Sequence, residues 1–132
     1  MKKNYKSMNG FLVKLDYNFE ELKNLTTINI ETKDIIRLNE VSDKSINFSV
    51  KRNMVFTPFT NTYIKVEFNV TTDLTSPINK ETFFEDIKTG LPQLTSIFSK
   101  ISLVISELTN MSPFGALITS PMYNNKEVLL EE

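Results

Sequence analysis

The sequence predicts an α+β fold, in which a four-stranded antiparallel sheet is followed by a short helix and by one long helix packed on one face of the sheet. Between residues 11 and 74, apolar and polar side chains alternate with a period of two, which is typical of strands with one wet face. After Pro77 the apolar residues recur with helical spacing, and strands followed by helices indicate an α+β architecture. A chain of 132 residues, 40% of them hydrophobic, is expected to form one domain over residues 1–132, with residues 1–10 and 124–132 as flexible tails.

The first two expected strands differ in how clearly the sequence defines them. Residues 11–19 alternate strictly, and their apolar members are Phe11, Val13, Leu15, Tyr17 and Phe19. Residues 26–32 repeat this pattern only at Ile28 and Ile30, and residues 20–25 could form a helical turn ahead of them. The second strand is therefore the least well defined element.

The third and fourth expected strands are joined by a short connection. Residues 45–56 alternate until Val55, which breaks the pattern and indicates a bulge or a register change near Asn53. Residues 63–74 form the clearest strand, with apolar side chains at Ile64, Val66, Phe68 and Val70. Because Pro58 ends the earlier strand and few residues separate the two, we expect an antiparallel hairpin.

Two helices are expected downstream. The shorter spans residues 79–89 and ends at Gly90, which is expected to form a left-handed cap. The longer begins at Pro92, whose missing N–H suits the first helical position, and ends before Pro113. Its apolar stripe consists of Leu94, Ile97, Phe98, Ile101, Val104, Ile105, Leu108 and Met111. Residues 115–122 are expected to form a strand-like or extended crossover.

The composition argues against catalysis and metal binding. The chain contains no Cys and no His, which removes the thiolate and imidazole groups on which most catalytic and zinc sites depend. Glu81 and Glu85, one helical turn apart, are the best-placed pair of carboxylates, but no orienting partner or glycine-rich phosphate loop accompanies them. We therefore expect no enzymatic activity, no cofactor and no metal site.

Charge and hydropathy indicate a cytoplasmic protein with no nucleic-acid partner and no membrane insertion. The 15 Lys and Arg residues against 16 Asp and Glu residues give a net charge of −1, so no overall field attracts phosphate backbones. Residues 1–10 lack the apolar core of a signal peptide, and polar residues interrupt the longest apolar stretch, residues 91–111. The absence of cysteine agrees with a reducing compartment.

The outer face of the long helix contains fewer charged residues than a solvated face usually does. Besides Lys100 and Glu107 it presents small polar residues, namely Thr95, Ser96, Ser99, Ser102, Ser106, Thr109 and Asn110. Such residues have poorer helix propensity than Lys or Glu, but they let a second helix approach closely. We therefore expect a homo-oligomer, a dimer or a tetramer, and the alternative is an ordinary low-charge surface. The expected interface includes Ser99, Ser102, Leu103 and Ser106.

Aromatic residues are more numerous in the strand region than one core face requires. They are Phe11, Tyr17, Phe19, Phe48, Phe56, Phe59, Tyr63 and Phe68. Either all except Phe59 and Tyr63 belong to the core, or some of them line an exposed groove that accepts extended apolar peptide.

Residues 90–123 contain a series of motifs in a fixed order. They are Leu91-Pro92 at the start of the long helix, Ser112-Pro113-Phe114-Gly115 in the turn after it, the apolar segment Ala116–Thr119, and the closing piece Ser120–Tyr123. In this order they resemble the SecB family of export chaperones, with the difference that proline precedes Phe114 here instead of following the aromatic residue.

The resemblance implies a fold and a function. The implied fold is a four-stranded antiparallel sheet backed by the long helix, with helices packed between the sheets of a dimer or tetramer. The implied function is that of a holdase, which binds unfolded or extended polypeptide segments, without catalysis, in grooves bordered by the crossover after the long helix. The residues implied to contact such segments are Phe114, Leu117, Ile118, Met122 and Tyr123.

Two departures from the family pattern modify these expectations. Only nine residues follow Tyr123, which leaves little room for the family's second helix and predicts a more open groove. The near-neutral charge contrasts with the acidic surface through which the family meets the translocase motor, which argues against a role in export. The alternative function is that of a non-enzymatic structural or assembly protein with the same fold, such as a small oligomeric accessory or phage-type component.

Overall fold

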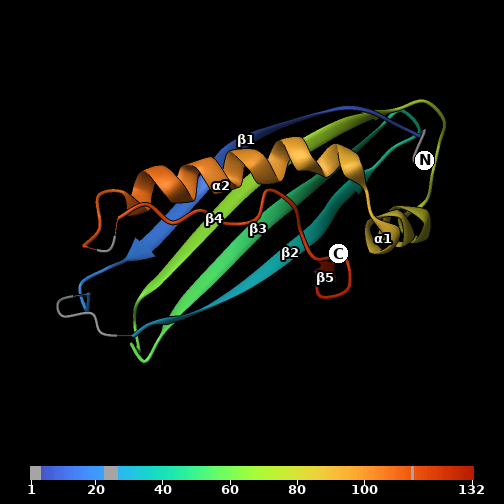
Figure 1. Cartoon of the computed structure of the whole chain (residues 1–132). Coiled ribbons are helices and arrows are strands. Elements are labelled where there is room, and N and C mark those ends of the chain that lie inside the picture. Colours follow the sequence, from blue (N-terminus) through green and yellow to red (C-terminus); the bar gives the residue numbers. More distant parts are fainter. Residues whose placement is uncertain (1–3, 23–26, 114) are drawn as a thin grey trace.

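A long twisted sheet forms one layer of the molecule, and the longer helix crosses one face of it (Figure 1). The computed structural model describes residues 4–22, 27–113 and 115–132. Its elements are β1 (Tyr5–Asn18), β2 (Asn29–Val41), β3 (Ser45–Thr57), β4 (Tyr63–Leu74), α1 (Lys80–Thr89), the 3-10 turn η1 (Pro92–Leu94), α2 (Thr95–Thr109) and β5 (Leu129–Glu131). The strand order is β1-β4-β3-β2-β5, and the first four are antiparallel. The expected α+β fold with a helix on one face is confirmed, and β5 adds a short parallel strand.

A single core lies between the sheet and α2. Alternate side chains of β3 and β4 are buried on this face together with the apolar stripe of α2. Phe48, Phe56 and Phe68 are part of this core, whereas Phe11 and Tyr17 are exposed. The opposite face of the sheet is polar; its hydrogen-bonded side chains include Asn39, Asn47, Ser49, Asn69 and Thr71. One layer of helix is therefore sufficient for this sheet.

The bounds of β4 are those predicted, and β3 ends one residue later than predicted. The bulge expected near Asn53 is wrong, because β3 keeps an unbroken register with both of its neighbours there. The break in the apolar-polar alternation has another cause. Arg52 occupies a core-facing position between Val50 and Met54, and Val55 lies on the polar face without any change of register.

β1 differs from the prediction in its start and in the face it turns to the core. The strand begins at Tyr5. A register shift between Leu12 and Lys14 changes which residues face the core, from even-numbered positions before the shift to odd-numbered positions after it. Leu12 pairs with Phe68 before the shift and Leu15 with Val66 after it. Since directly opposed residues of paired strands share a face, the strict alternation of residues 11–19 does not define a single buried face.

β2 spans Asn29–Val41, well beyond the predicted end at residue 32. The charged side chains after that residue interrupt the apolar pattern, but Ile36 and Leu38 are buried on the core face. The helical turn expected over residues 20–25 falls largely outside the described residues.

Part of each segment expected as a flexible tail, residues 5–10 and Leu129–Glu131, lies in the sheet. Tyr5 is buried, and its hydroxyl donates a hydrogen bond to Asp86 on α1 at 2.7 Å; burial, followed by this bond, raises the pKa of Tyr5. At the other end β5 pairs with Ile35–Arg37, and Lys80 forms an ion pair with Glu132 at 3.0 Å. The polar composition of both segments concealed these contacts.

The helices begin and end close to the predicted residues. The side chain of Asn79 caps α1 by accepting a hydrogen bond from the Thr82 N–H at 2.8 Å. Gly90 ends it with a φ of 105°, but its ψ of 121° differs from that of a left-handed helical residue. A Cβ added at Gly10 would lie 2.6 Å from the Cδ1 of Ile97, so glycine in β1 allows α2 to approach the sheet.

Candidate functional site

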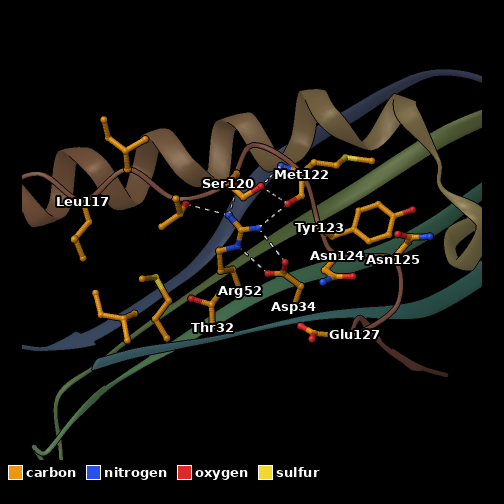
Figure 2. A pocket seen from close by; sticks show the side chains of 14 residues that line it. Thr32, Asp34, Arg52, Leu117, Ser120, Met122, Tyr123, Asn124, Asn125 and Glu127 are labelled. Carbon is orange, nitrogen blue, oxygen red and sulfur yellow. Dashed lines mark hydrogen bonds and ion pairs between the residues drawn. The ribbon is translucent and has the colours of Figure 1, made fainter. Parts of the chain in front are cut away.

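A groove of about 710 Å³ lies between β2 and the extended chain that follows α2 (Figure 2). We call this chain, residues 115–127, the crossover, and the cavity beneath it the crossover groove. Its lining residues are Ile30, Thr32, Asp34, Arg52, Met54, Leu117, Ile118, Thr119, Ser120, Met122, Tyr123, Asn124, Asn125 and Glu127. The crossover contains no assigned strand, so other contacts must hold it in place.

Arg52 is the main contact between the sheet and the crossover. It is 2% exposed, and its Nε and Nη2 donate to the two carboxylate oxygens of Asp34 at 2.8 and 2.9 Å. Nη1 donates to the Thr119 hydroxyl at 3.0 Å and to the Ser120 carbonyl at 2.6 Å, and Nη2 also donates to the Met122 carbonyl at 3.4 Å. These contacts use all five guanidinium donors. We call this arrangement the Arg52 latch.

The latch rests on an aromatic side chain of α2. The Cζ of Arg52 lies 5.1 Å from the centroid of the Phe98 ring, and the Phe98 ring in turn lies 5.5 Å from that of Tyr123. A guanidinium group favours this position because the ring face is negative. Sequence reasoning missed both Arg52 and Asp34 as parts of the site.

Three further hydrogen bonds hold the crossover at Leu117, Thr119 and Tyr123. The Leu117 N–H donates to the Thr109 hydroxyl at 2.7 Å, and the Ser102 hydroxyl donates to the Thr119 carbonyl at 2.9 Å. The Tyr123 hydroxyl donates to the Ile87 carbonyl at 2.7 Å. Burial raises the pKa of Tyr123, so its hydroxyl remains a donor across the neutral range. The groove is thus built by directional contacts along its whole length.

Four of the five residues expected to contact a polypeptide line this groove. Leu117 and Met122 are half-buried, and Ile118 is 88% exposed. Tyr123 is buried and acts mainly as an anchor, through its bonds to the ends of α1 and η1. The fifth, Phe114, lies outside the described residues.

The residues expected at an oligomer interface are divided between two sides of α2. Ser102 faces the chain's own crossover through its bond to Thr119, and Ser106 is half-buried. Ser99 is exposed, and Leu103 is 58% exposed. The part of this helix face that is open to a second copy is therefore narrower than expected.

The carboxylate pair considered for catalysis lies on the surface. Glu81 and Glu85 are both exposed on α1. Within residues 4–22, 27–113 and 115–132, no three acidic, histidine or cysteine side chains gather as they would around a metal ion. Of the helices that the structure describes, none is long and apolar enough to span a membrane.

Comparison with known proteins identifies the fold. No protein-family model matches the sequence, and no curated protein matches it. Among solved structures, the SecB-like chaperone Rv1957 of Mycobacterium tuberculosis, in complex with a ChAD peptide from the Rv1956 HigA1 antitoxin, is similar with a TM-score of 0.64 at 11% identity, over 89% of this chain and 90% of that chain. A protein of unknown function from Streptococcus agalactiae has a TM-score of 0.45 at 11% identity, over 85% of this chain and 93% of that chain. From the first of these likenesses and the element order above, this chain has the SecB-like chaperone fold.

Proposed function

We propose that this chain is a chaperone-type protein that binds unfolded or extended polypeptide segments in the crossover groove, without catalysis. The observation that supports this best is the groove itself. It is long and open, it has apolar side chains on the crossover, and the buried Arg52 latch sets its width. A large aliphatic side chain such as Ile118, 88% exposed on its rim, has no packing role in the single chain.

The fold supports the same function. The SecB-like chaperone of similar structure was solved with a peptide from another protein, which is the kind of partner that we propose here. The proposal includes a cytoplasmic location, consistent with the absence of cysteine, and a homo-oligomer in which Ser99 and Leu103 face a second copy.

Protection of a chemically unfolded model protein from aggregation tests the proposal. The wild-type protein is expected to delay aggregation at a small molar excess. Ile118→Asp is expected to abolish most of this delay, because an apolar segment bound in the groove would have to desolvate the new carboxylate. Met111→Asp is the matched control, because Met111 is 81% exposed and lies just after α2, outside the groove. The Met111→Asp variant should therefore protect the model protein as well as the wild type does.

The same assay separates the two candidate functions. A structural or assembly protein with this fold would give no protection even at several-fold molar excess, and the two Asp variants would behave alike. That result would overturn the chaperone proposal.

A further inference from the structure

The outer edge of β2 is only partly occupied. On its inner side β3 pairs with β2 over the whole of Asn29–Val41, whereas on its outer side β5 pairs only with Ile35–Arg37. In the part of the chain that the structure describes, no strand pairs with the outer edge of Asn29–Asp34. This stretch therefore presents main-chain N–H and C=O groups that can accept another strand.

A cavity lies against this unpaired stretch. Its volume is about 400 Å³, and its lining includes four consecutive β2 residues, Glu31–Asp34. Because successive side chains of a strand point to opposite faces, a cavity bordered by four in a row lies at the edge of the strand and not over one face. It also adjoins the crossover groove, since Thr32, Asp34, Asn124 and Glu127 line both cavities (Figure 2).

The chain itself shows that this edge accepts a strand. β5 pairs in parallel with the next three residues of β2, directly in line with the unpaired stretch (Figure 1). The outer edge of β2 thus has the correct geometry for a ladder where β5 pairs with it, immediately beyond the unpaired stretch. Six further residues remain, which is the usual length of a strand.

The side chains on the core face of this stretch provide the second half of a binding site. Ile30 and, just before the stretch, Ile28 border an apolar hollow of about 190 Å³ together with Phe56 and Leu117, and this hollow continues the crossover groove. Glu31 and Lys33 are paired with Val55 and Asn53 of β3 and therefore lie on the opposite, polar face. A strand added at this edge would place every second side chain toward the apolar hollow and the others toward water.

We propose that an extended segment of another polypeptide binds as an additional β-strand along Asn29–Asp34, with its alternate apolar side chains in the crossover groove. This inference rests on the proposed function and specifies its binding mode. Main-chain hydrogen bonds give affinity that is nearly independent of sequence, and the apolar hollow selects segments in which apolar and polar residues alternate. The preferred partner is therefore a β-like unfolded segment and not an amphipathic helix.

Backbone N-methylation of the ligand tests the binding mode without changing the protein. The probe is a fluorescent synthetic peptide of about ten residues in which valine and serine alternate between lysine ends. Two derivatives are N-methylated, one at the valines and one at the serines. A strand at a sheet edge uses every second N–H, so one derivative should bind at least about tenfold more weakly than the parent, about 1.4 kcal/mol, and the other within about twofold.

The outcomes separate this inference from the proposed function. If the parent peptide and both derivatives bind equally, the groove binds side chains alone and the added strand is overturned, while the proposed function stands. If the parent peptide does not bind, both fail. Amide hydrogen exchange provides an independent check: peptide should protect those amides within Asn29–Asp34 that point away from β3, and protection of the same amides before any peptide is added would instead indicate a second copy of this chain at the edge.

Discussion

The sheet extends beyond α2 on two sides, toward β2 and toward β1, and the two sides differ in how their apolar residues are covered. On the β2 side the crossover and β5 cover the core, and the crossover is held by directional hydrogen bonds that involve the side chains of Arg52, Ser102, Thr109 and Tyr123. On the β1 side no described segment plays this part, and large apolar side chains remain exposed. They are Phe11, Leu12, Val13, Leu15 and Tyr17.

This difference shows how the chain fixes an extended segment that has no secondary structure of its own. Apolar contacts alone do not specify the position of such a segment, but side chain to main chain bonds do, and they also satisfy its backbone groups. The β2 side is therefore a shaped groove. The β1 side is an exposed apolar surface with no such contacts among the described residues.

The largest effect is expected from removing the latch. Arg52→Met would leave the Asp34 carboxylate, 10% exposed, without its partner, and would release three residues of the crossover. We expect the free energy of unfolding to fall by about 3–5 kcal/mol, measured by urea denaturation.

Arg37→Met is the matched control, because Arg37 is the only other arginine and is exposed on β2. It should change the free energy of unfolding by no more than about 0.5 kcal/mol. Equal effects of the two substitutions would show that the latch does not stabilise the β2 side.

A smaller effect is expected at the anchor of the crossover. Tyr123→Phe removes a buried hydroxyl that donates to the Ile87 carbonyl and accepts from the Leu91 N–H at 2.9 Å. Leaving these backbone groups unpaired should cost about 1–3 kcal/mol in urea denaturation. Tyr17→Phe, on the exposed side of β1, should have almost no effect; a Tyr123→Phe protein as stable as the wild type would contradict the anchoring role.

The smallest effect on the free energy of unfolding is expected from a substitution at Leu103, on the exposed part of α2. The same substitution should clearly lower the mass of the particle in solution. Leu103→Lys puts a charge on the exposed part of the helix, and light scattering at tens of micromolar should show a shift from an oligomer to a smaller species. Val55→Lys, on the polar face of the sheet, should leave the mass unchanged. A wild-type protein that is already monomeric at this concentration would contradict the proposed oligomer.

The parts of the fold that the sequence predicts well are those with uninterrupted patterns. The alternation of residues 63–74 gives the bounds of β4, and the proline and glycine positions give those of the helices to within a few residues. The extension of β2 and the pairing of β5 depend on contacts between distant segments with polar side chains, which periodicity does not detect.

The candidate site also contains residues that the sequence predicts and residues that it does not. Leu117, Ile118 and Met122 follow from the resemblance of the segment after the helix to a known family, and the structure brings them together along one groove. The Arg52 latch was missed because Asp34 and Arg52 are 18 residues apart and nothing local links them. One signal was present: Arg52 stands in phase with the core-facing apolar residues of β3, where an unpaired charge is not tolerated.

Site-specific photo-crosslinking to an unfolded client tests the central claim most directly. A photoreactive residue at position 118, on the crossover groove, is compared with one at position 111, where the side chain is similarly exposed. Binding in the groove predicts client adducts at position 118 and few at position 111. Equal yields at the two positions, or adducts only at position 111, would contradict it.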